Sequence, residues 1–216
     1  MKKNHLIFIS VFTLLGIIAL QIPFTRLLGS GTNFTLFDFF APSAAAFIGT
    51  VPGVIAVFLM QLINLLIHGG KAIDLAGFIR LFPTLFAVAY FAKKRTSNIL
   101  IPVIAIIGFN LNPIGRSAWQ YSMFWLIPIA AHFFHKNLFI RSLGATFTAH
   151  AVGGVLWVWA FGLSRGIWLA LIPQVIMERI VMAAGIMASY VILSKVMDWA
   201  ASRKIIPAIF SLSESR

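Results

Sequence analysis

The feature that most constrains the fold is a succession of long apolar runs separated by short basic clusters. The runs cover residues 6–24, 39–67, 75–92, 98–112, 117–135, 143–163 and 167–197. About 20 apolar residues of helix cross the hydrocarbon core of a bilayer, and a helix satisfies its own backbone there. Hydrophobic residues make up 60% of the chain, charged residues only 10%, and the mean hydropathy is +0.96. We therefore expect an all-α polytopic membrane protein, with residues 1–216 forming one integral membrane domain.

The two ends of the chain fit this class. The run 6–24 is too long for the apolar region of a typical signal peptide, and no small-residue cleavage site follows it directly. We interpret it as a retained first transmembrane helix. The polar tail, at about 205–216, is expected to fray on the cytoplasmic side.

The run 39–67 contains 29 residues and is interrupted by "GTVPGV" at 49–54. A Pro-Gly pair disfavours a continuous helix. The sequence therefore predicts two segments, roughly 36–49 and 52–67, each of which crosses the membrane.

Orientation follows from the basic residues, which accumulate on the cytoplasmic side of membrane proteins. If 39–67 crosses twice, four basic residues beside the helices fall outside: Arg26, Lys71, Arg116 and Arg165. Ten then fall inside: Lys2, Lys3, Lys93, Lys94, Arg95, Lys136, Arg141, Lys195, Arg203 and Lys204. This pattern predicts a multi-pass protein of the cell (inner or plasma) membrane with both termini cytoplasmic. The literal count is eight crossings, or six if one short pair is re-entrant, in a compact bundle. The net charge of +12 is explained by this topology, so no nucleic-acid partner is expected.

Ionisable side chains are costly inside a bilayer, so each is a candidate for function. Glu178 and Arg179 lie about eleven residues into the last long run, near the membrane midplane. Gln174 is one turn earlier on the same face as Glu178. Glu178 could contact a ligand or take part in a structural Glu–Arg network. Arg179 points about 100° away and is expected to pair with another helix.

Further polar and aromatic candidates lie toward the outer ends of the runs. Asp38 could cap a helix or contact a ligand. The loop 108–125, with Asn112, Trp119 and Gln120, is either an interfacial turn or the cap of a pocket. Trp157 and Trp159 are about 200° apart on a helix, so only one of them can face a pocket.

The stretch "TFTAHAVGGVLWVW" places His150 within an apolar run. Ala149, His150 and Gly153 resemble the Ala-His-x-x-Gly motif of rhomboid intramembrane proteases, with Ser117 as a candidate nucleophile. However, Ala118 replaces the glycine of the serine motif, and about 15 Å of depth separates the two residues. We keep this serine protease as an alternative. The main interpretation is a buried hydrogen-bonding His150 that pairs with Arg- or Glu-bearing neighbours. Gly153 and the following Gly154 would then pack closely against the Glu178 helix.

Two regions resemble the substrate-binding S components of energy-coupling factor (ECF) vitamin transporters. They are "FTLFDFFAPSAAAFIGTVPGVIAVFLMQLINLLI" (34–67) and the last two runs (143–196), in which a Pro and a charged pair precede small residues and a basic end. The resemblance implies a six-helix bundle that is not an enzyme and holds no cofactor. It would capture a vitamin-like solute from the outer side and pass it inward with a transmembrane coupling protein and two ATPase subunits. The implied pocket residues are Asp38, Asn112, Trp119, Gln120, Trp157, Gln174 and Glu178. His150 and Arg179 are expected to pair helices, no metal site is expected, and another small transporter or channel stays open as an alternative.

Overall fold

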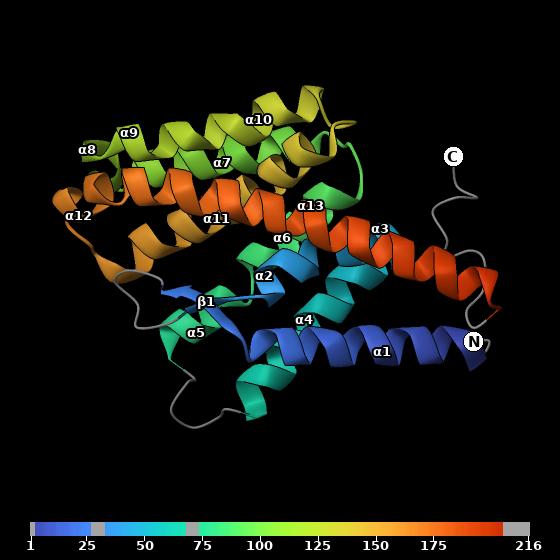
Figure 1. Ribbon diagram of the computed structural model, residues 1–216. Helices are drawn as coiled ribbons and strands as arrows, with labels where there is room; N and C mark the ends of the chain where they lie inside the picture. Colours follow the sequence, from blue (N-terminus) through green and yellow to red (C-terminus); the bar gives the residue numbers. More distant parts are fainter. Residues whose placement is uncertain (1–2, 27–32, 68–73, 205–216) are drawn as a thin grey trace.

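The computed structural model describes residues 3–26, 33–67 and 74–204, so the predicted tail at 205–216 and Lys71 lie outside the described residues. Nearly all of the described chain is helical, and each apolar run forms one or more helices (Figure 1). The elements of the first half are α1 (Lys3–Leu20), β1 (Pro23–Arg26), β2 (Asn33–Thr35), α2 (Phe37–Phe40), the 3-10 helix η1 (Ala41–Ser43), α3 (Ala44–Ile48), α4 (Thr50–Ile67), α5 (Leu75–Arg80) and α6 (Pro83–Ala92). Those of the second half are α7 (Ser97–Leu111), α8 (Pro113–Ser117), α9 (Trp119–Ser122), η2 (Met123–Trp125), α10 (Leu126–Phe133), α11 (Leu138–Phe161), α12 (Arg165–Ala170) and α13 (Ile172–Ser202).

The run 39–67 is broken, as predicted, but the break lies at Gly49 and not at the Pro-Gly pair. Gly49 has φ 89° and ψ 160°, a conformation that only glycine adopts without strain. Pro52 and Gly53 lie in the first turn of α4, where a proline needs no backbone donor. A Cβ added to Gly53 would lie 2.7 Å from the Cα of Ala45, so α3 and α4 pack backbone to backbone.

Helix α11 is the centre of the bundle, since it packs against α6, α13, α7 and α10. One hydrophobic cluster joins α1, α2, α3 and α4 with the end of α13. A second joins α7, α9, α11 and α12, and includes the fully buried Trp125 and the nearly fully buried Trp168. A third, smaller cluster joins α6, α11 and α13 around Tyr90 and Phe91.

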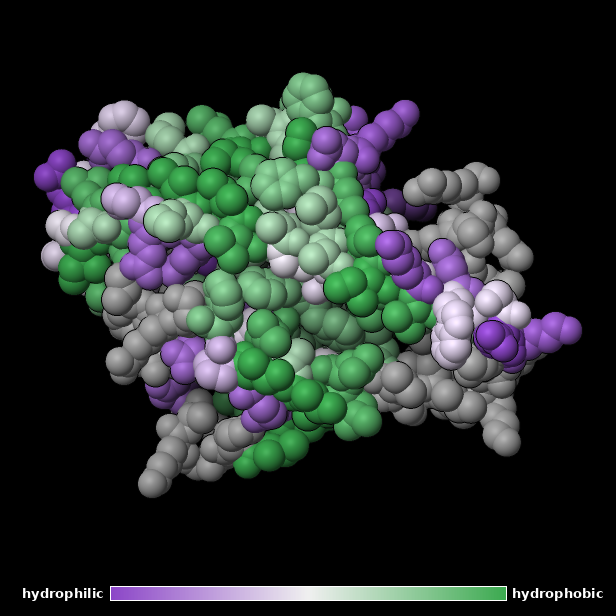
Figure 2. Space-filling view, viewed as in Figure 1, coloured by the Kyte–Doolittle hydropathy of each residue, from purple (hydrophilic) through white to green (hydrophobic). Residues whose placement is uncertain are grey.

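Four helices within the described residues are long and apolar enough to cross a membrane: Thr50–Ile67, Leu75–Ala92 (α5 and α6 together), Leu138–Phe161 and Ile172–Ser202. Phe37–Ile48 and Ser97–Leu111 are apolar but shorter. Large hydrophobic side chains lie exposed on their outer faces, for example Ile104, Met177 and Ile192. On the face shown in Figure 2, hydrophobic surface covers the middle of the molecule and hydrophilic residues gather toward its two ends. Such a surface suits lipid contact, because extended apolar surface is unusual on soluble monomers.

The two ends of the bundle differ. The first turn of α1 and the last turn of α13 lie at one end, whereas β1, α5, α8, α9 and α12 lie at the other (Figure 1). The segments at the first of these ends carry more of the basic residues. These are Lys93, Lys94 and Arg95 between α6 and α7, Lys136 and Arg141 around the start of α11, and Lys195, Arg203 and Lys204 at the end of α13, whereas the other end carries Arg26, Arg80, Arg116 and Arg165. The Lys94 ammonium lies 6.0 Å from the Phe133 ring, and the Arg141 guanidinium lies 4.2 Å from the Phe91 ring. We call this the basic end, and we call the opposite one the hairpin end.

The hairpin end takes its name from β1 and β2, a short antiparallel pair that the sequence did not predict. Pro23 pairs with Thr35 and Arg26 with Asn33, with an irregularity between Pro23 and Thr25. The Nη2 group of Arg80 donates a hydrogen bond to the carbonyl oxygen of Asn33, so α5 holds β2 in place.

Candidate functional site

A cavity of about 530 Å³ lies between β2, α2, α5, α6, α9, α11, α12 and α13. This volume is within the range of small-molecule binding sites, which are mostly apolar with a few placed polar groups. Its apolar lining includes Phe34, Phe37 and Ile186. Its polar lining includes Asn33, Asp38, Arg80, Tyr121, His150 and Arg179.

The cavity opens at the hairpin end. Its lining includes the last residue of α1, Leu20, together with Leu65 near the end of α4 and Leu163 after α11. The exposed residues Asn33 and Asp74 bring it to the surface. Two lining residues, Ala87 and Ile186, belong to the third hydrophobic cluster. Along α6 the lining ends at Ala87, and the buried Tyr90 and Phe91 of the same cluster follow before Lys93 and Lys94.

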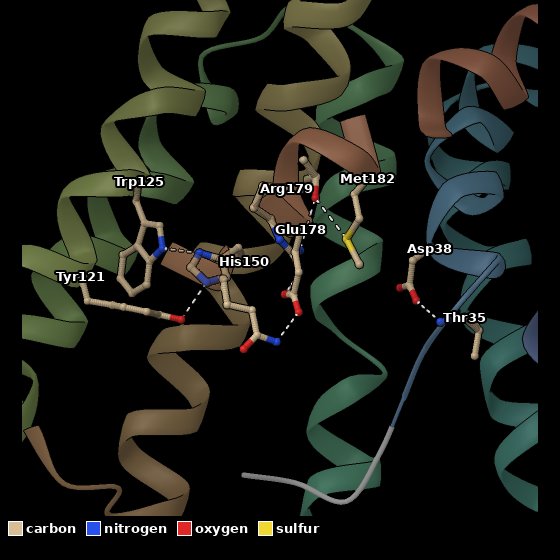
Figure 3. Close-up of polar contacts among 10 residues, drawn as sticks. Thr35, Asp38, Tyr121, Trp125, His150, Glu178, Arg179 and Met182 are labelled. Carbon is tan, nitrogen blue, oxygen red and sulfur yellow. Dashed lines mark hydrogen bonds and ion pairs between the residues drawn. The ribbon is translucent and has the colours of Figure 1, made fainter. Parts of the chain in front are cut away.

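Asp38 lines the cavity from the first turn of α2. Its Oδ2 atom accepts a hydrogen bond of 2.9 Å from the backbone N–H of Thr35, which fixes the carboxylate beside β2 (Figure 3). The positive charges of Arg80 and Arg179 both act on this carboxylate. Asp38 therefore shares the cavity lining with two cations, from α5 and α13.

Arg179 is the most deeply buried cation that lines the cavity, with 3% of its surface exposed. Its Nη1 donates to Oγ1 of Thr146 on α11 at 3.2 Å, so the prediction that it would pair with another helix is confirmed. Its Nη2 lies 3.5 Å from Oε2 of Glu178. The guanidinium carbon is 4.9 Å from the centre of the Phe34 ring. Arg179 thus joins α13, α11 and β2 at one point of the cavity wall.

Glu178 and Gln174 do not line the cavity. The Nε2 group of Gln174 donates to Oε1 of Glu178 at 2.7 Å, and the other carboxylate oxygen faces Arg179 (Figure 3). Of the two roles considered for Glu178, the observed contacts match the structural Glu–Arg network.

His150 lines the cavity from the middle of α11, and both of its ring nitrogens are hydrogen-bonded. Nε2 lies 2.8 Å from the hydroxyl of Tyr121, and Nδ1 accepts from the indole N–H of Trp125 at 3.0 Å (Figure 3). The expectation of an Arg- or Glu-bearing partner was therefore wrong. The actual partners, Tyr121 and Trp125, come from α9 and η2, within the loop that was expected to be either an interfacial turn or the cap of a pocket.

The expected packing of Gly153 and Gly154 on the Glu178 helix was also wrong. A Cβ on Gly154 would lie 2.5 Å from the Trp125 ring, and one on Gly153 would lie 3.5 Å from Pro83 of α6. The missing side chain of Gly154 makes room for the indole that binds His150. It is Gly185 that brings α13 close to a neighbour, the Phe39 ring of α2.

The polar loop 108–125 contributes less to the cavity than expected. Asn112 caps α8 by accepting from the N–H groups of Ile114 and Gly115, and it does not line the cavity. Trp119 and Gln120 are not lining residues either, and Trp119 is 51% exposed. Only the next residue of α9, Tyr121, reaches the cavity.

The two tryptophans of α11 behave as their spacing predicts. Trp157 lines the cavity and is 8% exposed. Trp159 is 59% exposed, and its indole N–H donates to the carbonyl oxygen of Gly108. The prediction that only one of them can face a pocket is confirmed.

The geometry does not bring Ser117 to His150. Ser117 is exposed, it does not line the cavity, and its hydroxyl donates to the carbonyl oxygen of Ile114 at 2.7 Å. The imidazole nitrogens are occupied by Tyr121 and Trp125. The described contacts thus contain no Ser–His pair of the kind that nucleophilic catalysis needs.

Sequence reasoning missed Arg80, Tyr121, Thr146 and Trp168 as cavity residues. Arg80 could have been found by the criterion that identified Glu178, because both are charged residues within an apolar run. Tyr121 and Trp168 gave no comparable signal, because aromatic residues near helix ends are common at membrane interfaces.

No group of three or more His, Cys, Asp or Glu residues suited to a metal ion occurs in the part of the chain that the structure describes. No protein-family model, curated protein or solved structure matches the chain.

Proposed function

We propose that the protein is a membrane-embedded uptake subunit that captures a small solute in the cavity from the outer side. One observation carries this proposal: the cavity opens at the hairpin end, opposite the end where the basic residues gather. The positive-inside rule places the basic end in the cytoplasm. The cavity then opens away from the cytoplasm and is closed toward it by the third hydrophobic cluster.

The arrangement of the helices supports a multi-pass topology with eight traverses of the bundle. Four helices are long enough to span a bilayer, and four further traverses come from α1, from α7 and from the consecutive short helices of Phe37–Ile48 and Pro113–Phe133. The first turn of α1 and the last turn of α13 lie at the same end, which fits an even number of passes and cytoplasmic termini (Figure 1). Eight traverses is more than the six that the ECF resemblance implies.

Within this class we favour a solute-binding subunit similar to an ECF S component. The cavity lies between α2, which belongs to the first region of resemblance, and α11 and α13, which belong to the second. On this proposal the chain binds the solute, and a transmembrane coupling protein with ATPase subunits supplies the energy for release inside.

The proposal can be tested by identifying the small molecule that the protein retains. The full chain is purified in detergent and denatured, and the released compounds are identified by mass spectrometry. We expect a stoichiometric solute from the wild type. Trp157→Leu is expected to reduce retention about tenfold, because the Trp157 indole lines the cavity, and this corresponds to the loss of about 1.4 kcal/mol of binding free energy.

Trp159→Leu is the matched control, because Trp159 lies on the same helix, is 59% exposed and does not line the cavity. It should retain the solute like the wild type. The absence of any retained solute from the wild type, or equal loss in the two variants, would contradict the proposal.

A further inference from the structure

We infer that the ligand of this cavity is a small organic carboxylate, held by a wall of hydrogen-bond donors from Tyr121, Trp168 and Arg179. All three residues line the cavity, from α9, α12 and α13 respectively. The inference rests on the proposed function, because it names the chemical class of the solute for the same site.

The first donor follows from the hydrogen bonds of His150. The indole N–H of Trp125 can only donate, so Nδ1 of His150 accepts and carries no proton. The imidazole is therefore neutral, with its proton on Nε2. That Nε2–H donates to the Tyr121 oxygen at 2.8 Å, which leaves the phenol proton to be donated elsewhere. Among the described residues no other hydrogen-bond partner lies at this hydroxyl, so its proton is available to a ligand in the cavity.

The second and third donors are buried N–H groups. The indole nitrogen of Trp168 and the Nε of Arg179 have no hydrogen-bond partner within the described ranges, although the two residues are 2% and 3% exposed. Buried polar groups are nearly always hydrogen-bonded, so such exceptions call for a partner. The Trp168 ring centre is 4.8 Å from that of Tyr121, so the two aromatic rings that carry these donors pack against each other.

The chemistry of the three groups selects the ligand. Indole and guanidinium nitrogens can only donate, and the Tyr121 oxygen already accepts from His150. A carboxylate offers two oxygens that accept several such bonds, and bonds from the permanently charged Arg179 to an anion are among the strongest in proteins. The present contact of Arg179 with Glu178 is long, at 3.5 Å. An ammonium group, in contrast, would bring further donors to this wall, which offers it no acceptor.

The test compares three compounds that share one ring and differ only in the attached group: benzoate, benzamide and benzylamine. Each is titrated into the detergent-purified full chain, and affinity is measured from the ligand-dependent rise of the unfolding temperature. We expect benzoate to stabilise the protein most and benzylamine not to stabilise it. Tyr121→Phe should weaken benzoate binding about tenfold, because one donor to the carboxylate is lost.

Tyr90→Phe is the matched control. The Tyr90 hydroxyl is also buried, but it donates to the carbonyl oxygen of Pro128 at 2.7 Å and does not line the cavity. This variant should lower the unfolding temperature and leave the affinity for benzoate unchanged. Loss of benzoate binding in both variants would show that Tyr121 acts through general stability and would overturn the donor wall.

The remaining outcomes separate this inference from the proposed function. Benzamide or benzylamine binding as tightly as benzoate would overturn the carboxylate inference and leave a solute-binding cavity. A retained native solute without a carboxylate would do the same. If none of the three compounds binds and the purified protein retains no solute, the proposed function itself is wrong.

Discussion

Two adjacent glycines of α11, Gly153 and Gly154, are predicted to respond to alanine with opposite signs. Replacing a glycine within a helix by alanine stabilises the helix by about 0.5–1 kcal/mol when the Cβ has room. At Gly153 the added Cβ would lie 3.5 Å from Pro83, which is ordinary van der Waals contact. Gly153→Ala should therefore stabilise the protein by up to about 1 kcal/mol.

At Gly154 the same atom would lie 2.5 Å from the ring of Trp125. This indole is fully buried, packs edge-to-face on Phe109 and donates to His150, so it cannot move without loss. Overpacking of this kind costs about 1–3 kcal/mol, and weakening a buried hydrogen bond costs roughly 1 kcal/mol more. After subtraction of the helix-propensity gain, Gly154→Ala should destabilise the protein by about 1–3 kcal/mol.

The two variants can be compared by thermal unfolding in the same detergent and at the same heating rate. For a chain of this length, 1 kcal/mol corresponds to a shift of about 2–4 °C. We expect Gly153→Ala to unfold slightly above the wild type and Gly154→Ala several degrees below it. Equal unfolding temperatures for the two variants, or a Gly154→Ala protein as stable as the wild type, would refute the close packing of Trp125 on α11.

Two other predictions concern positions outside the cavity. His135 follows α10 and is buried near the carbonyl oxygen of Tyr90, and burial lowers its pKa below the ordinary 6.5, an effect to which the charge of Arg141 adds. The His135 imidazole therefore binds a proton less readily in the folded state than in the unfolded state. The neutral imidazole contributes to the free energy of unfolding above about pH 6.5, and this contribution is lost as the pH falls. The unfolding temperature should fall less between pH 7.5 and 5.5 in His135→Gln than in the wild type, and an equal fall would contradict this assignment. Gly49→Asn should destabilise the protein by about 1–3 kcal/mol, because its φ of 89° and ψ of 160° suit only glycine. Gly162→Asn should be nearly neutral, because φ 50° and ψ 28° are left-handed helical values that asparagine tolerates. A similar loss in both asparagine variants would show that the backbone conformation at Gly49 is not the cause.

The helical class and the approximate positions of the long helices could be predicted from the sequence, because both depend on local pattern. The predicted runs 143–163 and 167–197 overlap the observed helices Leu138–Phe161 and Ile172–Ser202, and the break near Gly49 was visible as a Gly/Pro cluster. The division of the runs 75–92 and 117–135 into shorter helices was not predicted. The opposite directions of Trp157 and Trp159 also follow from helical periodicity alone. In contrast, β1 and β2 had no signal, since their pairing joins segments on either side of a loop.

The cavity could be predicted only in part. Asp38 and Trp157 were predicted to line a pocket, and both line the cavity. His150 and Arg179 were predicted to pair helices, and they line the cavity as well. Asn112, Trp119, Gln120, Gln174 and Glu178 were expected in the pocket but do not line it: Asn112 caps a helix, Trp119 is exposed, and Gln174 binds Glu178. Residue type marks a polar side chain as costly within the membrane, but it does not say whether a ligand or a neighbouring residue satisfies it.

By itself the sequence determined that this chain forms apolar helices, where they turn, and which end of the bundle is basic, because these properties belong to short stretches of residues. The tertiary structure decided which side chains share a cavity. The rotation of each helix depends on packing between distant segments, such as Trp125 seated on Gly154 or Arg179 held by Thr146. The same packing leaves the phenol proton of Tyr121 available inside the cavity, and only the observed contacts of His150 reveal it.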